Sequence, residues 1–206
     1  MVPRDGVVET VNPESLDTHT LRQAYALGIF PMGDDSGEIS FYQPLDRALL
    51  PITGLHISRS LQKFLRKHAY RVSFDEDFEG TMRSCIRPVE NWITEELIRV
   101  YVEAHREGWA HSCEVWDGSE LVGGTYGVAI GEIFSAESMF HRRTNASKLA
   151  LHSMVTRCRE VGFKFFDAQV MNPHLKSLGA YEISQAVYEY HLRRGLNQRT
   201  IWDLRA

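Results

Sequence analysis

The chain has 206 residues, 43% hydrophobic and 11% aromatic, enough to bury a sizeable core in one domain with or without a small second one. A formal net charge of −4 excludes a surface coated in positive charge of the kind that binds DNA indiscriminately, but it is compatible with a local basic patch. The three cysteines stand far apart without zinc-type spacing, so we expect no disulfide framework, no metal site and a reducing, cytoplasmic location. No apolar run reaches the roughly 20 residues of a membrane span, so we expect no membrane insertion.

The first quarter of the chain predicts a small unit of its own. Its pattern predicts a helix over 18–27 and a short strand over 39–42. Prolines and a glycine then punctuate residues 44–54, which is typical of a boundary between two folding units. We therefore expect a small N-terminal domain over 1–54 and a main domain over 55–206.

The remaining sequence alternates between helical and strand periodicity. Helices are predicted at 58–67, 74–84 and 94–107. The period then changes from helical to alternating, which predicts an antiparallel meander of three strands at 111–116, 121–130 and 133–140. A helix that begins after Asn145 and ends at Gly162 is predicted next, followed by a strand over 163–171. This order predicts a mixed α+β fold.

Two of the predicted strands carry polar side chains inside apolar sequence. With a period of two, Asp167 and Gln169 share one strand face, and Ser135, Glu137 and Met139 share a face of another strand. Because a buried carboxylate or amide is costly without a partner, these side chains are candidates for a functional site. The spacing alone leaves another interpretation open, in which Asp167 and Gln169 satisfy each other or the backbone and Glu137 pairs with an arginine.

Several short strings, spread over most of the chain, follow the order of one enzyme family. They include Ala26-Leu27-Gly28-Ile29-Phe30-Pro31, Trp92-Ile93-Thr94, Glu137-Ser138-Met139-Phe140, Asp167-Ala168-Gln169 and Ser177-Leu178-Gly179-Ala180. In these strings the chain resembles the leucyl/phenylalanyl-tRNA–protein transferases. These bacterial enzymes attach an amino acid from charged tRNA to the N-terminus of a protein.

This resemblance implies an α+β fold in which a small N-terminal α/β domain precedes a GNAT-like, that is acetyltransferase-like, C-terminal domain with a mixed sheet. It implies that Glu137, Asp167 and Gln169 form the catalytic centre of an aminoacyltransferase. Such an enzyme moves Leu, or Phe or Met, from aminoacyl-tRNA to the α-amino group of proteins with N-terminal Arg or Lys, and so marks them for N-end-rule degradation. The expected donors are therefore Leu-tRNA and Phe-tRNA.

The chemistry of the reaction suits these residue types. The ester that joins an amino acid to tRNA is already activated, so the enzyme mainly has to deprotonate, orient and hold the amine, and no metal, cofactor or acyl-enzyme is expected. In the family's picture, Asp167 orients Gln169 beside the attacking amine, while Glu137 suits a cationic acceptor side chain. Glutamine is a weak base, so Gln169, the ribose hydroxyl and water all stay open as carriers of the proton.

The resemblance also implies an apolar pocket for the donor's side chain. Its lining would come from large, soft side chains: Tyr42, Trp92, Tyr101, Phe134, Met139, Leu151 and Met154. Side chains of this kind at strand or helix spacing also suit an ordinary core. Where relatives carry two tryptophans and a serine before a proline, this chain has Phe41-Tyr42-Gln43-Pro44, and Thr125 stands where an apolar residue is common. The preferred donor therefore stays open.

A basic segment without acids is the candidate contact for tRNA. No Asp or Glu occurs between residues 47 and 74. On the helix predicted there, basic side chains recur at spacings of three and four residues and share a face: Arg59, Lys63, Arg66 and Lys67. We expect them to contact backbone phosphates, with a solvated helix face as the alternative. A second, separate candidate for tRNA contact comprises Arg142, Arg143 and Lys148.

Two other functions compete with aminoacyl transfer. A GNAT-type acyl-CoA N-acyltransferase would need a glycine-containing loop for the pyrophosphate, and residues 141–148 contain no glycine. A non-catalytic tRNA-binding module would leave Glu137, Asp167 and Gln169 as structural groups. Activity with charged tRNA separates the three functions.

Overall fold

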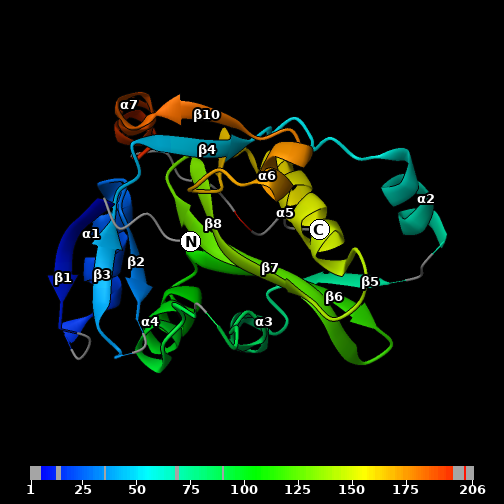
Figure 1. Cartoon of the computed structure of the whole chain (residues 1–206), viewed down its shortest axis with the longest axis horizontal. Coiled ribbons are helices and arrows are strands. Elements are labelled where there is room, and N and C mark those ends of the chain that lie inside the picture. The colour runs from blue at the N-terminus through cyan, green and yellow to red at the C-terminus, as the bar shows by residue number, and fades with distance from the viewer. Residues whose placement is uncertain are drawn as a thin grey trace.

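Two β-sheets organise the structure, a computed structural model that describes residues 6–12, 15–34, 36–67, 70–89, 91–196 and 202. Within these residues the smaller sheet has the strand order β1-β3-β2 and the larger one β10-β4-β9-β8-β7-β6-β5 (Figure 1). The strands are β1 (Val7–Val11), β2 (Phe30–Gly33), β3 (Ile39–Tyr42), β4 (Asp46–Leu50), β5 (Arg71–Phe74), β6 (Ala110–Asp117), β7 (Glu120–Ile130), β8 (Ile133–His141), β9 (Phe165–Asp167) and β10 (Tyr181–Ser184). The helices are α1 (Thr18–Ala26), α2 (Arg59–Lys67), α3 (Phe78–Ser84), α4 (Glu95–Arg106), α5 (Ala146–Val161), α6 (Pro173–Ser177) and α7 (Gln185–Gly195). The predicted mixed α+β fold is confirmed.

The larger sheet is built around the predicted meander. Strands β6, β7 and β8 pair antiparallel in chain order, and β9 then pairs parallel to β8. The crossover from β8 to β9 runs through α5, because a parallel pair needs a long connection. Strand β4 closes on the other side of β9 and carries β10 at the edge. The sheet is therefore mixed, with β8 and β9 side by side at its centre.

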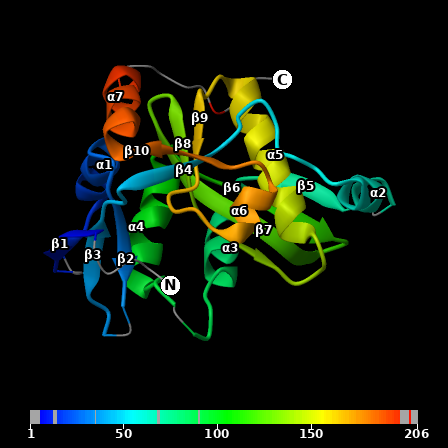
Figure 2. The ribbon, with the colours of Figure 1, turned by 45° about the horizontal axis from the view of Figure 1, so that its top comes forward.

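Helices cover both faces of the larger sheet and divide the core into two clusters. Helix α5 packs on one face, where Leu151, Met154 and Phe134 belong to one cluster. Helices α3 and α4 and the smaller sheet lie on the opposite face and share the other cluster, which includes Tyr101 and Tyr126 (Figures 1 and 2). Alternate residues of the central strands serve the two clusters, as period two requires.

The ends of several helices lie where the sequence predicts them. Thr94 caps α4 by accepting a hydrogen bond from the Leu97 N–H, and the helix runs to Arg106. Gly162 ends α5 with a φ of 103°, a left-handed conformation that glycine adopts without strain. At the other end of α5, Asn145 occupies the cap position, but its side chain makes no capping hydrogen bond.

The predicted helix over 74–84 is wrong over residues 74–77. Residues Arg71–Phe74 form strand β5, which pairs with β6, and only Phe78–Ser84 are helical as α3. The break comes from two aspartates. Asp75 has a φ of 59°, which a helix cannot accommodate, and the side chain of Asp77 accepts a hydrogen bond from the Gly80 N–H and starts the helix there.

The predicted strand over 163–171 is confirmed only over Phe165–Asp167, and its predicted end is wrong because β9 stops at Asp167. Gln169 has a φ of 63°, in the left-handed region, so the chain turns directly after the strand. Period two therefore does not relate Asp167 to Gln169. A side-chain-to-backbone turn relates them instead, since the Gln169 N–H donates to Asp167 Oδ1 over 2.8 Å.

Strand β4 lies within the segment 1–54 that the sequence assigns to a small domain, yet it pairs with β9 and β10 in the larger sheet. The division into 1–54 and 55–206 stays a prediction. Helix α2 lies at the far edge of the molecule, beyond β5, in both views (Figures 1 and 2). Among the residues with described positions, no helix is both long and apolar enough to cross a membrane.

Candidate active site

Asp167, at the end of β9, is a fully buried carboxylate with several donors around it. Its Oδ2 accepts hydrogen bonds from Ser135 Oγ and from Tyr188 Oη, each over 2.9 Å. The guanidinium of Arg47, also fully buried, brings its Nε to 3.4 Å from the same oxygen. A buried carboxylate is tolerated only when it is paired and hydrogen-bonded, and Asp167 meets both conditions.

Arg47 and Tyr188 are residues that the sequence analysis missed. Arg47 lies on β4, 4.2 Å from the Tyr188 ring centroid, and its Nη2 donates to the Gly28 carbonyl over 2.9 Å. The available signal in the sequence was an arginine directly before the apolar run Ala48-Leu49-Leu50, and in the structure all four of these residues are buried. The predicted alternative of a carboxylate–arginine pair thus applies to Asp167 rather than to Glu137.

Gln169 is held at both its backbone and its side chain. Besides the bond to Asp167, its carbonyl accepts from the Ala48 N–H over 3.0 Å, so the turn is tied to β4. Its side-chain Nε2 donates to Glu137 Oε1 over 3.0 Å. The carboxylate fixes which way the amide points, because it offers only acceptor atoms when ionised. The amide oxygen of Gln169 is consequently directed away from Glu137.

Glu137 lies at an irregularity of β8. The pairing of β7 with β8 shifts between Tyr126 and Gly127, which oppose Ser138 and Ala136, so Glu137 has no direct partner and forms a β-bulge. A Cβ at Gly127 would collide with the backbone of Ser135, so the close approach of β7 there needs a glycine.

The bulge corrects the predicted strand faces. Ser135 bonds to Asp167 on the side of α4 and α7, and Glu137 faces Tyr101 of α4 on the same side. Met139 instead packs in the cluster of α5 on the opposite face. The prediction that these three side chains share a face holds for the first two and is wrong for Met139, because the extra residue reverses the alternation.

Two tyrosines complete the surroundings of Glu137. Tyr101 Oη donates to Glu137 Oε2 over 3.2 Å, and Tyr25 of α1 lies 2.5 Å, oxygen to oxygen, from Tyr101 Oη. Burial raises the pKa of Glu137 to about 7 from an ordinary 4.5, and the charge of Asp167 adds to this rise. Hydrogen bonds from Tyr25, Gln169 and Tyr101 oppose it. Glu137 is only partly buried by accessible surface, so it can meet a substrate while titrating near neutrality.

The candidate donor-pocket residues lie on both faces of the sheet. One group packs together against α5 and comprises Phe134, Met139, Leu151 and Met154. The other group, on the opposite face, comprises Tyr42, Trp92 and Tyr101. The structure thus brings the first group together and places Tyr101 at Glu137 rather than in an apolar pocket. The Thr125 hydroxyl donates to the Ser138 carbonyl over 2.9 Å, so its polarity is satisfied within the sheet.

The residues predicted to contact tRNA lie in two separate places, on α2 and near the beginning of α5. Arg59 and Lys63 are exposed on α2, whereas the side chains of Arg66 and Lys67 lie outside the described residues. In the second candidate group, Arg142 donates to the Leu121 carbonyl and to Ser84, and Arg143 pairs with Glu120 at 3.0 Å. The structure assigns each of these two arginines to a local contact, and it leaves Lys148 beside a cavity.

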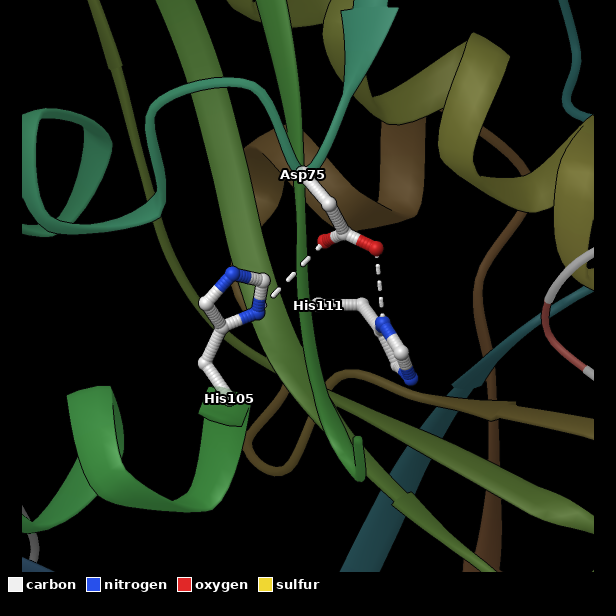
Figure 3. Close-up of side chains that lie close together, drawn as sticks. All are labelled: Asp75, His105 and His111. Atoms are coloured by element: carbon white, nitrogen blue, oxygen red, sulfur yellow. Dashed lines mark hydrogen bonds and ion pairs between the residues drawn. The ribbon is translucent and has the colours of Figure 1, made fainter. Parts of the chain in front are cut away.

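A separate cluster of metal-ligand type lies away from these residues. Figure 3 shows Asp75 between His105 of α4 and His111 of β6. Asp75 Oδ2 accepts from His111 Nδ1 over 2.9 Å, and Oδ1 accepts from the Ser112 N–H over 2.8 Å. His105 Nδ1 donates to the Ala110 carbonyl over 2.8 Å and lies 3.8 Å from Asp75 Oδ1. Because these facing atoms already bond within the protein, the cluster ties α4 to β5 and β6.

Two of the solved structures that resemble this chain are distant from it in sequence. One is the L-PGS of Bacillus licheniformis, with a TM-score of 0.44 and 11% identity, covering 75% of this chain and 51% of the other. Another is a functionally unknown conserved protein of Staphylococcus epidermidis, with a TM-score of 0.42 and 8% identity, covering 82% of this chain and 65% of the other. The fold class rests on the strand and helix order described above.

Comparison of sequences is far more specific. Residues 49–193 match the family described as leucyl/phenylalanyl-tRNA protein transferase, and residues 14–45 match the N-terminal domain of the same family. The leucyl/phenylalanyl-tRNA–protein transferase of Cereibacter sphaeroides is 47% identical over 188 residues, which cover 90% of this chain and 88% of the relative. That of Ruegeria pomeroyi is 44% identical over 89% of this chain and 88% of the relative. The chain belongs to the leucyl/phenylalanyl-tRNA–protein transferase family and is an aminoacyltransferase that moves an amino acid from aminoacyl-tRNA to a protein.

Proposed function

We propose that the protein transfers Leu, or Phe or Met, to the α-amino group of proteins with N-terminal Arg or Lys, and that Glu137, Asp167 and Gln169 are its active site. The linked pair of Gln169 and Glu137, joined over 3.0 Å at the bulge of β8, is the observation that carries this proposal. The products would be marked for N-end-rule degradation. The proposed setting is the cytoplasm, where charged tRNA is found, and the proposed fold of the main domain is GNAT-like.

Each of the three residues would have a separate task. Asp167 acts as a positioning residue, because it holds the backbone N–H of Gln169 while it is itself held by Arg47 and Tyr188. Gln169 offers its amide oxygen to the attacking amine, since its nitrogen is occupied by Glu137. Such positioning within attack distance is a large part of catalysis when the acyl group is already activated.

The bond changes follow from the substrates. The acceptor's amine attacks the ester carbonyl, an amide bond forms, and the bond to the ribose oxygen of the tRNA breaks. The amine's proton goes to that ribose oxygen, directly or through a water, so the tRNA leaves with a free hydroxyl. In this route Gln169 only forms a hydrogen bond to the amine and does not have to act as a base.

Glu137 would supply the negative charge that recognises an N-terminal Arg or Lys. The proposal has support from its partial exposure and its pKa of about 7, since an incoming cation stabilises the ionised form and is bound more tightly as the carboxyl loses its proton. The KM for a cationic acceptor should therefore fall as the pH rises through 7. Phosphate contacts by Arg59 and Lys63 on the acid-free segment around α2 would hold the body of the tRNA.

Peptide labelling with purified leucyl-tRNA tests the proposed function. We expect transfer to peptides that begin with Arg or Lys, and none to the same peptides with an acetylated N-terminus. Glu137→Gln should raise the KM for the cationic peptide at pH 8 more than the KM for leucyl-tRNA, whereas Glu182→Gln, on the exposed surface of β10, should change neither. If the KM for the peptide and the KM for leucyl-tRNA rise equally, Glu137 does not recognise the acceptor.

A further inference from the structure

A cavity of about 600 Å³ opens between the end of α3 and the beginning of α5, which lie on opposite faces of the sheet, and the proposed function assigns this cavity no role. It lies where β8 ends and α5 begins, between the segment after α3 and helix α6. Met139, one of the candidate donor-pocket residues, lines it. His141, four residues beyond Glu137, lines it as well, roughly 13 Å along a strand from the proposed site. The cavity therefore borders the active site without including the catalytic side chains.

The basic groups of this cavity set its chemistry. Arg87, His141, Lys148 and His174 line it, from four different parts of the chain, and none of the described lining residues is acidic. Arg87 and Lys148 have no carboxylate within ion-pairing distance among the residues whose positions are described. This contrasts with Arg143, which a neighbouring glutamate neutralises. A cavity with uncompensated cations and no acid attracts an anion.

The beginning of α5 adds to this positive potential. Asn145 lines the cavity, is left-handed with a φ of 65° and leaves the helix without a side-chain cap, and the first turn of α5 holds no acid. Ser147 and Lys148, in that first turn, line the cavity too. Uncapped N–H groups at the start of a sixteen-residue helix favour a negative ligand. The nearby charges of Lys148 and His141 add to burial in lowering the pKa of His174, which places these groups within electrostatic reach of one another.

We propose that this cavity binds phosphate of the 3′-terminal nucleotides of aminoacyl-tRNA. The inference rests on the proposed function, and it gives the place at which the 3′ end of the aminoacyl-tRNA binds. The other substrate fits poorly, because an acceptor with N-terminal Arg or Lys is cationic and would be repelled by Arg87 and Lys148. The pyrophosphate of an acyl-CoA shares the chemistry of a nucleic-acid phosphate, so the test has to separate these two sources.

A short RNA hairpin ending in CCA tests the proposal through its backbone. One version carries ordinary phosphodiesters, and another carries uncharged methylphosphonates at the last two linkages. The wild-type protein should bind the uncharged version about tenfold more weakly, as expected for loss of a charge-assisted contact. Lys148→Met, which keeps the apolar stem but removes the charge, should bind both versions nearly equally, and Lys148→Arg should restore the difference. Lys164→Met, at an exposed lysine outside the cavity, is the matched control and should behave as wild type.

The same variants separate the possible outcomes. If Lys148→Met keeps the full tenfold difference, or if the wild type shows none, the phosphates bind elsewhere and the proposal is overturned. If coenzyme A binds the wild type and Lys148→Met abolishes that binding, the cavity belongs to a coenzyme and the assignment to tRNA is wrong. Peptide labelling by the wild type is measured in parallel. If the wild type labels the peptide but binds both hairpins equally, only the role of the cavity is refuted. If the wild type does not label the peptide, the proposed function is refuted.

Discussion

Replacing Glu137 by Gln should stabilise the protein at alkaline pH and not at acid pH. The substitution keeps an oxygen for the Gln169 amide and a polar group for Tyr101, but it cannot ionise. In the wild type the pKa of Glu137 is raised, chiefly by burial, so the folded protein holds a proton that the unfolded chain gives up. Below pH 4.5 the carboxyl is protonated in both the folded and the unfolded state, so its burial does not lower the free energy of unfolding.

The size of the effect follows from the two pKa values. Between pH 4.5 and about 7 the folded state binds more protons than the unfolded state, so the free energy of unfolding falls as the pH rises. Above pH 7 the carboxyl is ionised in both the folded and the unfolded state, and the free energy of unfolding falls no further on its account. A rise in pKa from 4.5 to about 7 corresponds to about 3 kcal/mol, an upper bound because Glu137 is partly solvated. The difference between variant and wild type should therefore grow by up to this amount from pH 4.5 to pH 8.

Urea denaturation at pH 4.5, 6 and 8 measures the difference, with the free energy of unfolding taken from the midpoint and slope at each pH. Glu182→Gln, at an exposed position on β10, is the control and should give a difference that hardly varies with pH. If the difference for Glu137→Gln is the same at all three values, or if it is largest at pH 4.5, the burial argument for this carboxylate is refuted.

Three further outcomes are expected. Arg47→Met should lower the free energy of unfolding by about 3 kcal/mol in urea denaturation, because Asp167 would stay buried without its cation, and the loss should shrink when Asp167→Asn is combined with it. Gly127→Ala should lower the melting temperature and the rate of peptide labelling together, since its Cβ meets the backbone at the bulge beside Glu137; unchanged labelling would contradict a role for the bulge. Arg59→Ala with Lys63→Ala should flatten the plot of log affinity for tRNA against log salt by about 1.4 to 1.8, and an unchanged slope would place the tRNA away from α2.

The sequence predicts those parts of the fold that local signals determine. The cap at Thr94, the stop at Gly162 and the three-stranded meander all depend on residues close together in the chain. The left-handed turns at Asp75 and Gln169 are different, because neither residue is glycine and only the surrounding contacts hold that conformation. Periodicity therefore extended a helix and a strand through both positions.

The proposed active site was predictable only in part for a similar reason. Glu137, Asp167 and Gln169 were identified from the family's strings, and the structure joins them by hydrogen bonds. Their partners were not predictable, because Arg47 comes from β4 and Tyr188 from α7, and no local pattern relates these segments to β9. The bulge at Glu137 was equally hidden, since a single extra residue in β8 is recognised only against its neighbour β7.

The environment of Asp167 also has a consequence for how the protein is made. Its cation lies on β4 and its tyrosine on α7, so the buried carboxylate has no complete set of partners until both of these distant segments have been synthesised. Contacts between such distant segments form late and slow the folding of a domain. A chain synthesised only as far as Gln169 would hold Asp167 without Tyr188, and we expect transferase activity only once α7 has packed against β9.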